Sequence, residues 1–170
     1  MQQIFEIMPN TMKKSNRREI REKVLQVLYA YEFNGEGLTH LTNEILSDVN
    51  VESDIAFAKQ LINRVVANRN DLDNQIRARV ENWEMERIAL IDRILLRIGI
   101  AELFYFQEIP PKVSINEVID IAKDYSTANS GKFINGILDA ILSDLKKEGM
   151  LNKSGRGLIE ESLPKKSNDE

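Results

Sequence analysis

The fold of this chain is decided by one stretch, residues 86–106, which reads ERIALIDRILLRIGIAELFYF. Its apolar side chains fall on almost every side of a helix, at Ile88, Leu90, Ile91, Ile94, Leu95, Leu96, Ile98 and Ile100. A helix that is apolar on most sides is buried on most sides. No apolar run approaches the length of a membrane span, since even residues 98–106 are interrupted by Glu102. We therefore predict that this stretch forms the central helix of a globular core.

Apolar spacing and capping residues predict further helices before the central one. The first covers residues 16–33, because Asn16 and Glu19 form a capping box ahead of an apolar face. A shorter helix is expected at 39–48. Ser53 is expected to cap a third helix that reaches residue 68, and Asp71 to open a fourth.

Two more helices are predicted after the central one. The Pro110-Pro111 pair must leave helical geometry, because a proline disfavours helix in the residue before it. Ser114 and Glu117 then form a second capping box for a helix to residue 125. The last helix covers 130–147, and Gly149 ends it.

The predicted fold class is therefore all-α, a compact bundle of about seven helices in one domain at residues 13–149. We expect residues 1–12 to be a disordered N-terminal extension, with Met12 as the natural start, and 150–170 to be a flexible tail. Residues 1–12 hold no basic residue and are not a secretory signal. A cytoplasmic location fits these features.

Composition excludes several kinds of site. The 170 residues contain no Cys and a single His, His40, so thiolate chemistry, disulfides and His-rich metal sites are not expected. No catalytic motif is present, and acidic residues lie beside Arg on helices, as Asp92 does near Arg97, which is typical of solvated faces. We expect no catalytic residue, no metal and no cofactor, and hence not an enzyme.

Charge allows nucleic-acid binding only through a local surface. The net charge is −4 and the isoelectric point about 5.2, unlike a general nucleic-acid binder. One local candidate is the start of the first helix, where four basic residues share one stripe: Lys14, Arg17, Arg18 and Arg21. This stripe could follow a phosphate backbone, or it could be an ordinary solvated face. Spacing alone does not choose between the two.

The second candidate is Asn129-Ser130-Gly131-Lys132-Phe133, which opens the last helix. Free backbone N–H groups, Ser130 and Lys132 could bind a phosphate there, and Phe133 could stack on an unpaired base. The alternatives are that Ser130 is only a cap and that Phe133 belongs to the core. The segment is not a nucleotide-binding P-loop, because the first Gly of that motif is missing and no strand precedes it.

Several segments, taken together and in order, resemble the NusB family of transcription antitermination proteins. They are Arg17-Arg18-Glu19-Ile20-Arg21 with Gln26-Val27-Leu28-Tyr29, the central Ile91-Asp92-Arg93-Ile94-Leu95-Leu96-Arg97-Ile98 with Glu102-Leu103, the stretch Ile109-Pro110, Val113, Asn116-Glu117 and Ala122-Lys123, and Lys132-Phe133-Ile134-Asn135-Gly136-Ile137-Leu138-Asp139. They span residues 17–142. Ile20 departs from the family's small residue, Asn129 from its frequent acidic residue, and the tail extends beyond the usual family end.

The resemblance implies a fold of two helical subdomains and a function. NusB proteins pair with the ribosomal protein NusE, bind the boxA element of nascent RNA, and help RNA polymerase resist termination on ribosomal-RNA operons. By position, Arg17, Arg18, Arg21, Lys132 and Phe133 would then contact RNA, and Asp92 would lie toward NusE.

Two other functions stay open from the sequence. NusB-like domains also occur at the front of ribosomal-RNA cytosine methyltransferases, so the chain could be a detached RNA-recognition module. It could also be a purely protein-binding helical scaffold, with a solvated basic stripe. The sequence does not decide whether the chain forms a homodimer.

Overall fold

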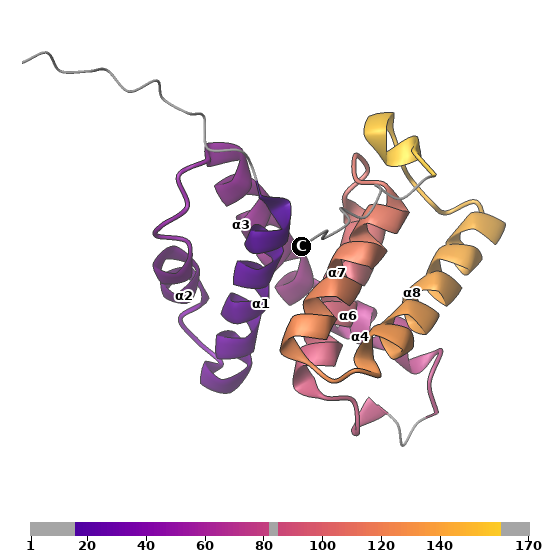
Figure 1. Cartoon of the computed structure of the whole chain (residues 1–170), viewed down its shortest axis with the longest axis horizontal. Helices are drawn as coiled ribbons and strands as arrows, with labels where there is room; N and C mark the ends of the chain where they lie inside the picture. Colours follow the sequence, from indigo (N-terminus) through magenta and orange to yellow (C-terminus); the bar gives the residue numbers. More distant parts are fainter. Residues whose placement is uncertain (1–15, 82–84, 161–170) are drawn as a thin grey trace, which may run out of the picture.

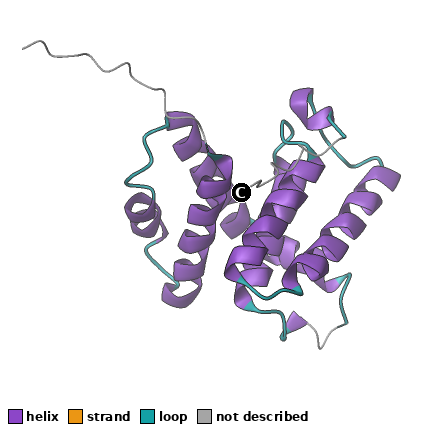
Figure 2. Ribbon diagram, in the orientation of Figure 1, coloured by secondary structure: helices purple, strands orange, loops and turns teal. Residues whose placement is uncertain are grey.

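The computed structural model describes residues 16–81 and 85–160. Within these residues all regular secondary structure is helical and no strand occurs (Figure 2). A single 3₁₀ turn follows seven α-helices: α1 Arg17–Asn34, α2 Leu38–Ile45, α3 Glu52–Ala67, α4 Arg69–Arg77, α6 Leu90–Tyr105, α7 Pro111–Tyr125, α8 Ser130–Lys147 and the 3₁₀ turn Gly155–Leu158. The predicted all-α class is confirmed.

The helices form two groups with α6 between them (Figure 1). Helices α1, α2 and α3 pack on one another in the first group, and α4, α7 and α8 surround α6 in the second. Helix α6 also contacts α1 and α3, so it belongs to the interface between the groups. The expected arrangement of two helical subdomains is thus confirmed.

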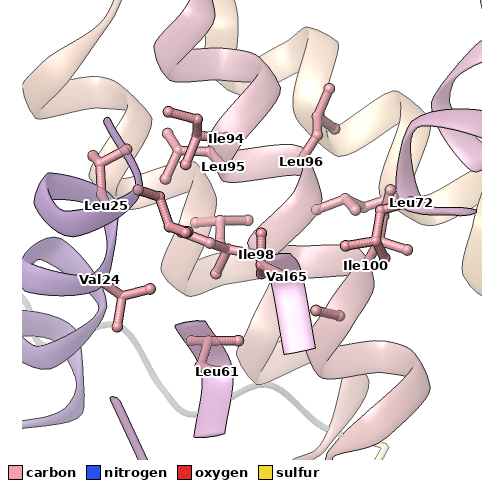
Figure 3. Packing of buried hydrophobic residues seen from close by; sticks show 14 of the residues in the cluster. Val24, Leu25, Leu61, Val65, Leu72, Ile94, Leu95, Leu96, Ile98 and Ile100 are labelled. Atoms are coloured by element: carbon pink, nitrogen blue, oxygen red, sulfur yellow. The ribbon is translucent and has the colours of Figure 1, made fainter. Parts of the chain in front are cut away.

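The core is built around α6, as its apolar sequence predicts. Ile94, Leu95 and Ile98 are at most 1% exposed and lie among side chains of α1 and α3 (Figure 3). On another side, α8 comes so close that a Cβ added at Gly99 would lie 2.8 Å from Leu138 Cδ1. Helix α6 begins at Leu90, four residues later than the start of the predicted segment.

Only one of the three predicted N-caps is confirmed. The Asn16 side chain accepts a hydrogen bond from the Glu19 backbone N–H at 3.2 Å, as expected. Ser53 was the wrong cap, because α3 begins at Glu52 after Val51. Ser114 was also wrong: α7 begins at Pro111, a residue whose fixed φ suits the first helical position. The Ser114 hydroxyl instead donates to the buried Glu102 carboxylate at 2.9 Å.

Residues 150–160, the first part of the expected flexible tail, contact the rest of the chain at defined points, and we call them the strap. The strap follows Gly149, which ends α8 with φ 67°, and it contains the 3₁₀ turn. Its Ser154 backbone N–H donates to the Gln107 carbonyl at 3.0 Å. Residues 1–12 and 161–170, including the proposed start at Met12, lie outside the described residues.

Candidate nucleic-acid interface

The first turns of α1 carry three of the four residues of the expected basic stripe, Arg17, Arg18 and Arg21, and we call this region the arginine end. Lys14 lies outside the described residues. The side chains of Arg17 and Arg18 are 41% and 37% exposed, whereas that of Arg21 is 3% exposed. The stripe is therefore open to solvent at two of these positions and closed at the third.

Arg21 forms a buried ion pair that joins α1 to α6. Its Nε and Nη2 donate to the two carboxylate oxygens of Glu102, at 2.8 and 2.6 Å. Burial is the largest single influence on the pKa of Arg21 and lowers it, but the charge and hydrogen bonds of Glu102, together with the charge of Glu117, outweigh burial and raise the pKa above its ordinary value. The expectation that Arg21 faces solvent is therefore wrong, and in this structure it holds α1 on α6.

The exposed arginines are paired with carboxylates as well. Arg18 donates to Glu117 at 2.9 Å and to Asp120 at 2.8 Å, both on α7, and the bond to Glu117 is the main reason that its pKa is raised. Arg17 lies 3.0 Å from the buried Asp54 of α3. With Glu102 included, three guanidinium groups face four carboxylates, so the arginine end has no excess of positive charge.

The start of α8 is a second region, built on a cluster of hydroxyl groups. Ser130 is 3% exposed and donates to Asp92 Oδ2 at 2.7 Å. The hydroxyls of Ser126 and Thr127 each lie 2.9 Å from the Ser130 oxygen. Because its proton goes to Asp92, the Ser130 oxygen accepts from these neighbours. Ser130 therefore fixes the loop between α7 and α8 and does not face an outside ligand.

Asp92 lies in the interior, contrary to the expectation that it faces a protein partner. It is 7% exposed, and its Oδ1 is buried without a hydrogen-bond partner in the described part of the chain. Of the two neighbours at the start of α8, Lys132 is exposed, whereas Phe133 is half-buried and packs against the core. No side chain caps α8 at Asn129, and the Ser130 backbone N–H donates to the Thr127 carbonyl, which leaves the next backbone N–H groups, of Gly131 and Lys132, for other acceptors.

Helix α6 sets the spacing between these two regions. Asp92 near its start holds Ser130, and Glu102 near its end holds Arg21. Ten residues of α-helix separate the two carboxylates, which is about 15 Å along the axis. In Figure 1, α1 and α7 lie side by side, and α8 begins at the far end of α7 from the arginine end. The arginine end and the start of α8 are therefore two separate regions and do not form one continuous site.

An acidic strip along α1 and α7 was missed by the sequence analysis. Glu22 of α1 is half-buried, and burial followed by the charge of Asp124 on α7 raises its pKa above the ordinary value. Glu117 and Asp120 lie on the same strip beside Arg18. Periodicity places each of these residues on a helix face, but only the packing of α1 on α7 shows that the two faces meet.

Other kinds of site find no support among residues 16–81 and 85–160. No group of three or more His, Cys, Asp or Glu side chains is arranged to hold a metal ion. The side chain of the single His, His40, is 83% exposed. None of the helices described is both long and apolar enough to cross a membrane.

The fold and the two regions place the chain in one class of protein. It is a compact all-α protein whose buried central helix, α6, binds polar and charged side chains at the starts of other helices. The NusB family model matches residues 18–143, and the chain belongs to the NusB family. It is 49% identical over 154 residues to the transcription antitermination protein NusB of Chloroherpeton thalassium, covering 89% of this chain and 72% of that protein.

Two solved structures share the fold. The structure of T. maritima NusB is 37% identical, with a TM-score of 0.72, and covers 77% of this chain and 93% of its own. A crystal structure of the antitermination factors NusB and NusE in complex with dsRNA is 27% identical, with a TM-score of 0.69. It covers 75% of this chain and 96% of its own.

Proposed function

We propose that the protein is an RNA-binding adaptor that acts as a transcription antitermination factor. In this proposal it binds boxA-type RNA together with the ribosomal protein NusE and works on ribosomal-RNA operons in the cytoplasm. The observation that carries the proposal is that α6 anchors two regions through carboxylates about 15 Å apart along its axis, and that basic side chains open to solvent lie at both regions. The similarity to a NusB structure that contains NusE and RNA supports it.

The residues divide into direct contacts and positioning residues. We propose that Arg17 and Arg18 contact phosphates at the arginine end, and that Lys132 and the uncapped N–H groups of α8 contact phosphates at the second region. The partly exposed ring of Phe133 would stack on a base. Arg21 and Ser130, which were expected to touch RNA, act here by holding α1 and α8 in place.

RNA binding by this chain alone is expected to be weak. Its net charge is −4, and the arginine end is neutralised by its own carboxylates. Affinity for RNA depends on the number of phosphates that basic groups neutralise. We therefore propose that NusE supplies part of the RNA-binding surface, and that the assembly joins the RNA polymerase antitermination complex.

Whether the chain forms a homodimer is a separate question, which sedimentation of the protein in the absence of RNA answers.

An electrophoretic shift with boxA RNA tests the proposal, using the protein and NusE alone and together. We expect little shift with either protein and a clear shift with both. Lys132→Ala should weaken the shift, whereas Lys59→Ala, a change at an exposed lysine of α3, should leave it unchanged. Absence of a shift under every combination would overturn the proposal, and equal loss with both variants would assign the effect to general charge.

A further inference from the structure

The strap crosses the C-terminal end of α6 and is fixed there at several points. The beginning of the strap is fixed on α8, where the backbone N–H of Met150 donates to the Leu145 carbonyl at 2.9 Å, and its middle is fixed just after α6 by the bond from Ser154 to Gln107. Gly157 is buried so tightly against Gln107 that a Cβ at this position would collide with the Gln107 carbonyl. The strap therefore has a specific docked position on the loop between α6 and α7.

Lys153 is the one strap residue that reaches the carbonyls of α6 itself. Its Nζ donates to the Phe106 carbonyl at 2.7 Å and to the Glu102 carbonyl at 3.1 Å. The last turn of α6 contains no basic residue of its own. Carbonyl groups at a helix C-terminus need hydrogen-bond donors from outside the helix, and the Lys153 amine supplies such donors from another part of the chain.

The same two residues of α6 also support the arginine end, through their side chains. The Glu102 carboxylate binds Arg21, and the Phe106 ring packs edge-on against Phe57 of α3 at a centroid distance of 5.6 Å. The Arg17 guanidinium lies 4.3 Å from the centre of the Phe57 ring. Lys153 thus holds the carbonyls of the residues whose side chains position the arginines.

We propose that the strap is a built-in conformational control element, which when docked fixes the end of α6 and thereby the arginine end of α1, and when released loosens both. This control of the arginine end follows from the contacts of Lys153, Glu102 and Phe106, and it does not depend on RNA binding. If the function proposed above also holds, release of the strap would weaken RNA contacts at Arg17 and Arg18 without touching Lys132.

The charge environment of Lys153 gives the strap a pH dependence. Burial lowers the pKa of Lys153 to about 8, and the nearby Glu102 and Glu108 carboxylates only partly oppose this effect. Arg21 already neutralises the Glu102 carboxylate. Because the pKa is lower in the docked state than in a free lysine, docking strengthens as pH rises from about 8 toward the ordinary lysine pKa. The neutral amine still has two N–H groups, one for each carbonyl.

Hydrogen exchange of the full-length chain tests the proposal, comparing the wild type with Lys153→Met and with Gly157→Ala. Lys153→Met removes the ammonium, and Gly157→Ala forces the strap off by collision and leaves the charge. Both should speed amide exchange by about tenfold in the strap, at the end of α6 and in the second turn of α1. Lys59→Met, at an exposed lysine of α3, is the control and should change none of these amides.

Two results would overturn the proposal. Faster exchange confined to the strap would show that it covers α6 without controlling the arginine end. No change in either variant would show that the strap is not held by these contacts. Protection of the strap in the wild type, corrected for intrinsic exchange, should increase between pH 8 and 10, and Lys153→Met should abolish this increase. A pH dependence that persists in Lys153→Met would remove Lys153 from the control element.

Discussion

The arginine end and the start of α8 are both anchored on α6, but they differ in how their charges are used. At the arginine end, every described arginine faces a carboxylate of the same chain. At the start of α8, Lys132 is exposed and forms no ion pair with any described residue. The number of basic residues in a segment therefore does not give the positive charge that a phosphate could use. The arginine end has more basic residues than the start of α8, but each of its described arginines is already paired with a carboxylate.

The two α6 carboxylates that hold these regions, Glu102 and Asp92, also differ in how many hydrogen bonds they accept. The Glu102 carboxylate accepts two hydrogen bonds from Arg21 and one from Ser114, and it is fully buried. The Asp92 carboxylate accepts one hydrogen bond, from Ser130. The end of α6 is thus fixed by a buried ionic network, and its start by a single charged hydrogen bond.

The largest effect is expected from Glu102→Ala. Removing the carboxylate leaves the Arg21 guanidinium charged and buried, which typically costs about 3–5 kcal/mol in the free energy of unfolding. Asp92→Ala removes one hydrogen bond to a charged group and should cost about 1–3 kcal/mol. Urea denaturation measures both values. Equal losses for the two variants would contradict the difference between the anchors.

A smaller effect, on RNA affinity, is expected at Phe133. Stacking of a base on an aromatic ring contributes about 1–3 kcal/mol, so Phe133→Leu should weaken binding of boxA RNA with NusE present by about tenfold or more. Leucine retains most of the packing against the core, which keeps loss of stacking apart from loss of folding. If Phe133→Leu binds RNA like the wild type, Phe133 is a core residue only, and Lys132 alone carries this region.

At the arginine end, removal of a carboxylate should strengthen RNA binding. Asp120→Asn removes the negative charge of one of the two partners of Arg18, which should raise the affinity several-fold and the salt dependence by up to about one phosphate contact. Arg18→Ala should do the reverse, with a smaller loss than Lys132→Ala, because Arg18 is already engaged. Salt titrations of RNA binding with NusE present measure both. An unchanged affinity in Asp120→Asn would show that Arg18 does not reach RNA.

Much of the fold follows from the sequence, because it depends on apolar periodicity. The buried faces of α1, α6 and α8 repeat at helical spacing, and turn residues such as Gly35, at φ 68°, mark their ends. Helix starts were less predictable where two signals competed. At α7, Ser114 and Glu117 match a capping box, yet Pro111 begins the helix and both side chains serve other helices.

The site was harder to predict, because exposure depends on which helix faces meet. Asp92 and Arg97 were expected to be solvated, as alternating charges on a helix usually are. Both are buried, and Arg97 donates to Asp73 of α4 at 2.7 Å. Arg21 shares a stripe with Arg18 in the sequence, but α6 covers one of them and not the other. No spacing rule within a single helix contains that information.

The smallest expected effect concerns Glu22 on the acidic strip between the two regions. Its pKa is raised in the folded state, so the folded protein holds this proton more tightly than the unfolded chain. The resulting penalty is present at neutral pH and is relieved as pH falls through the raised pKa. Because Glu22 is only half-buried, Glu22→Gln should stabilise the fold at pH 7 by no more than a few tenths of a kcal/mol, about the limit for surface changes.

Urea denaturation at pH 7 and pH 4.5 measures this gain in the free energy of unfolding, which should shrink at the lower pH. Glu36→Gln, at an exposed glutamate between α1 and α2, is the matched control. A gain that is the same at both pH values would show that ionisation of Glu22, whether opposed by burial or by Asp124, does not destabilise the fold.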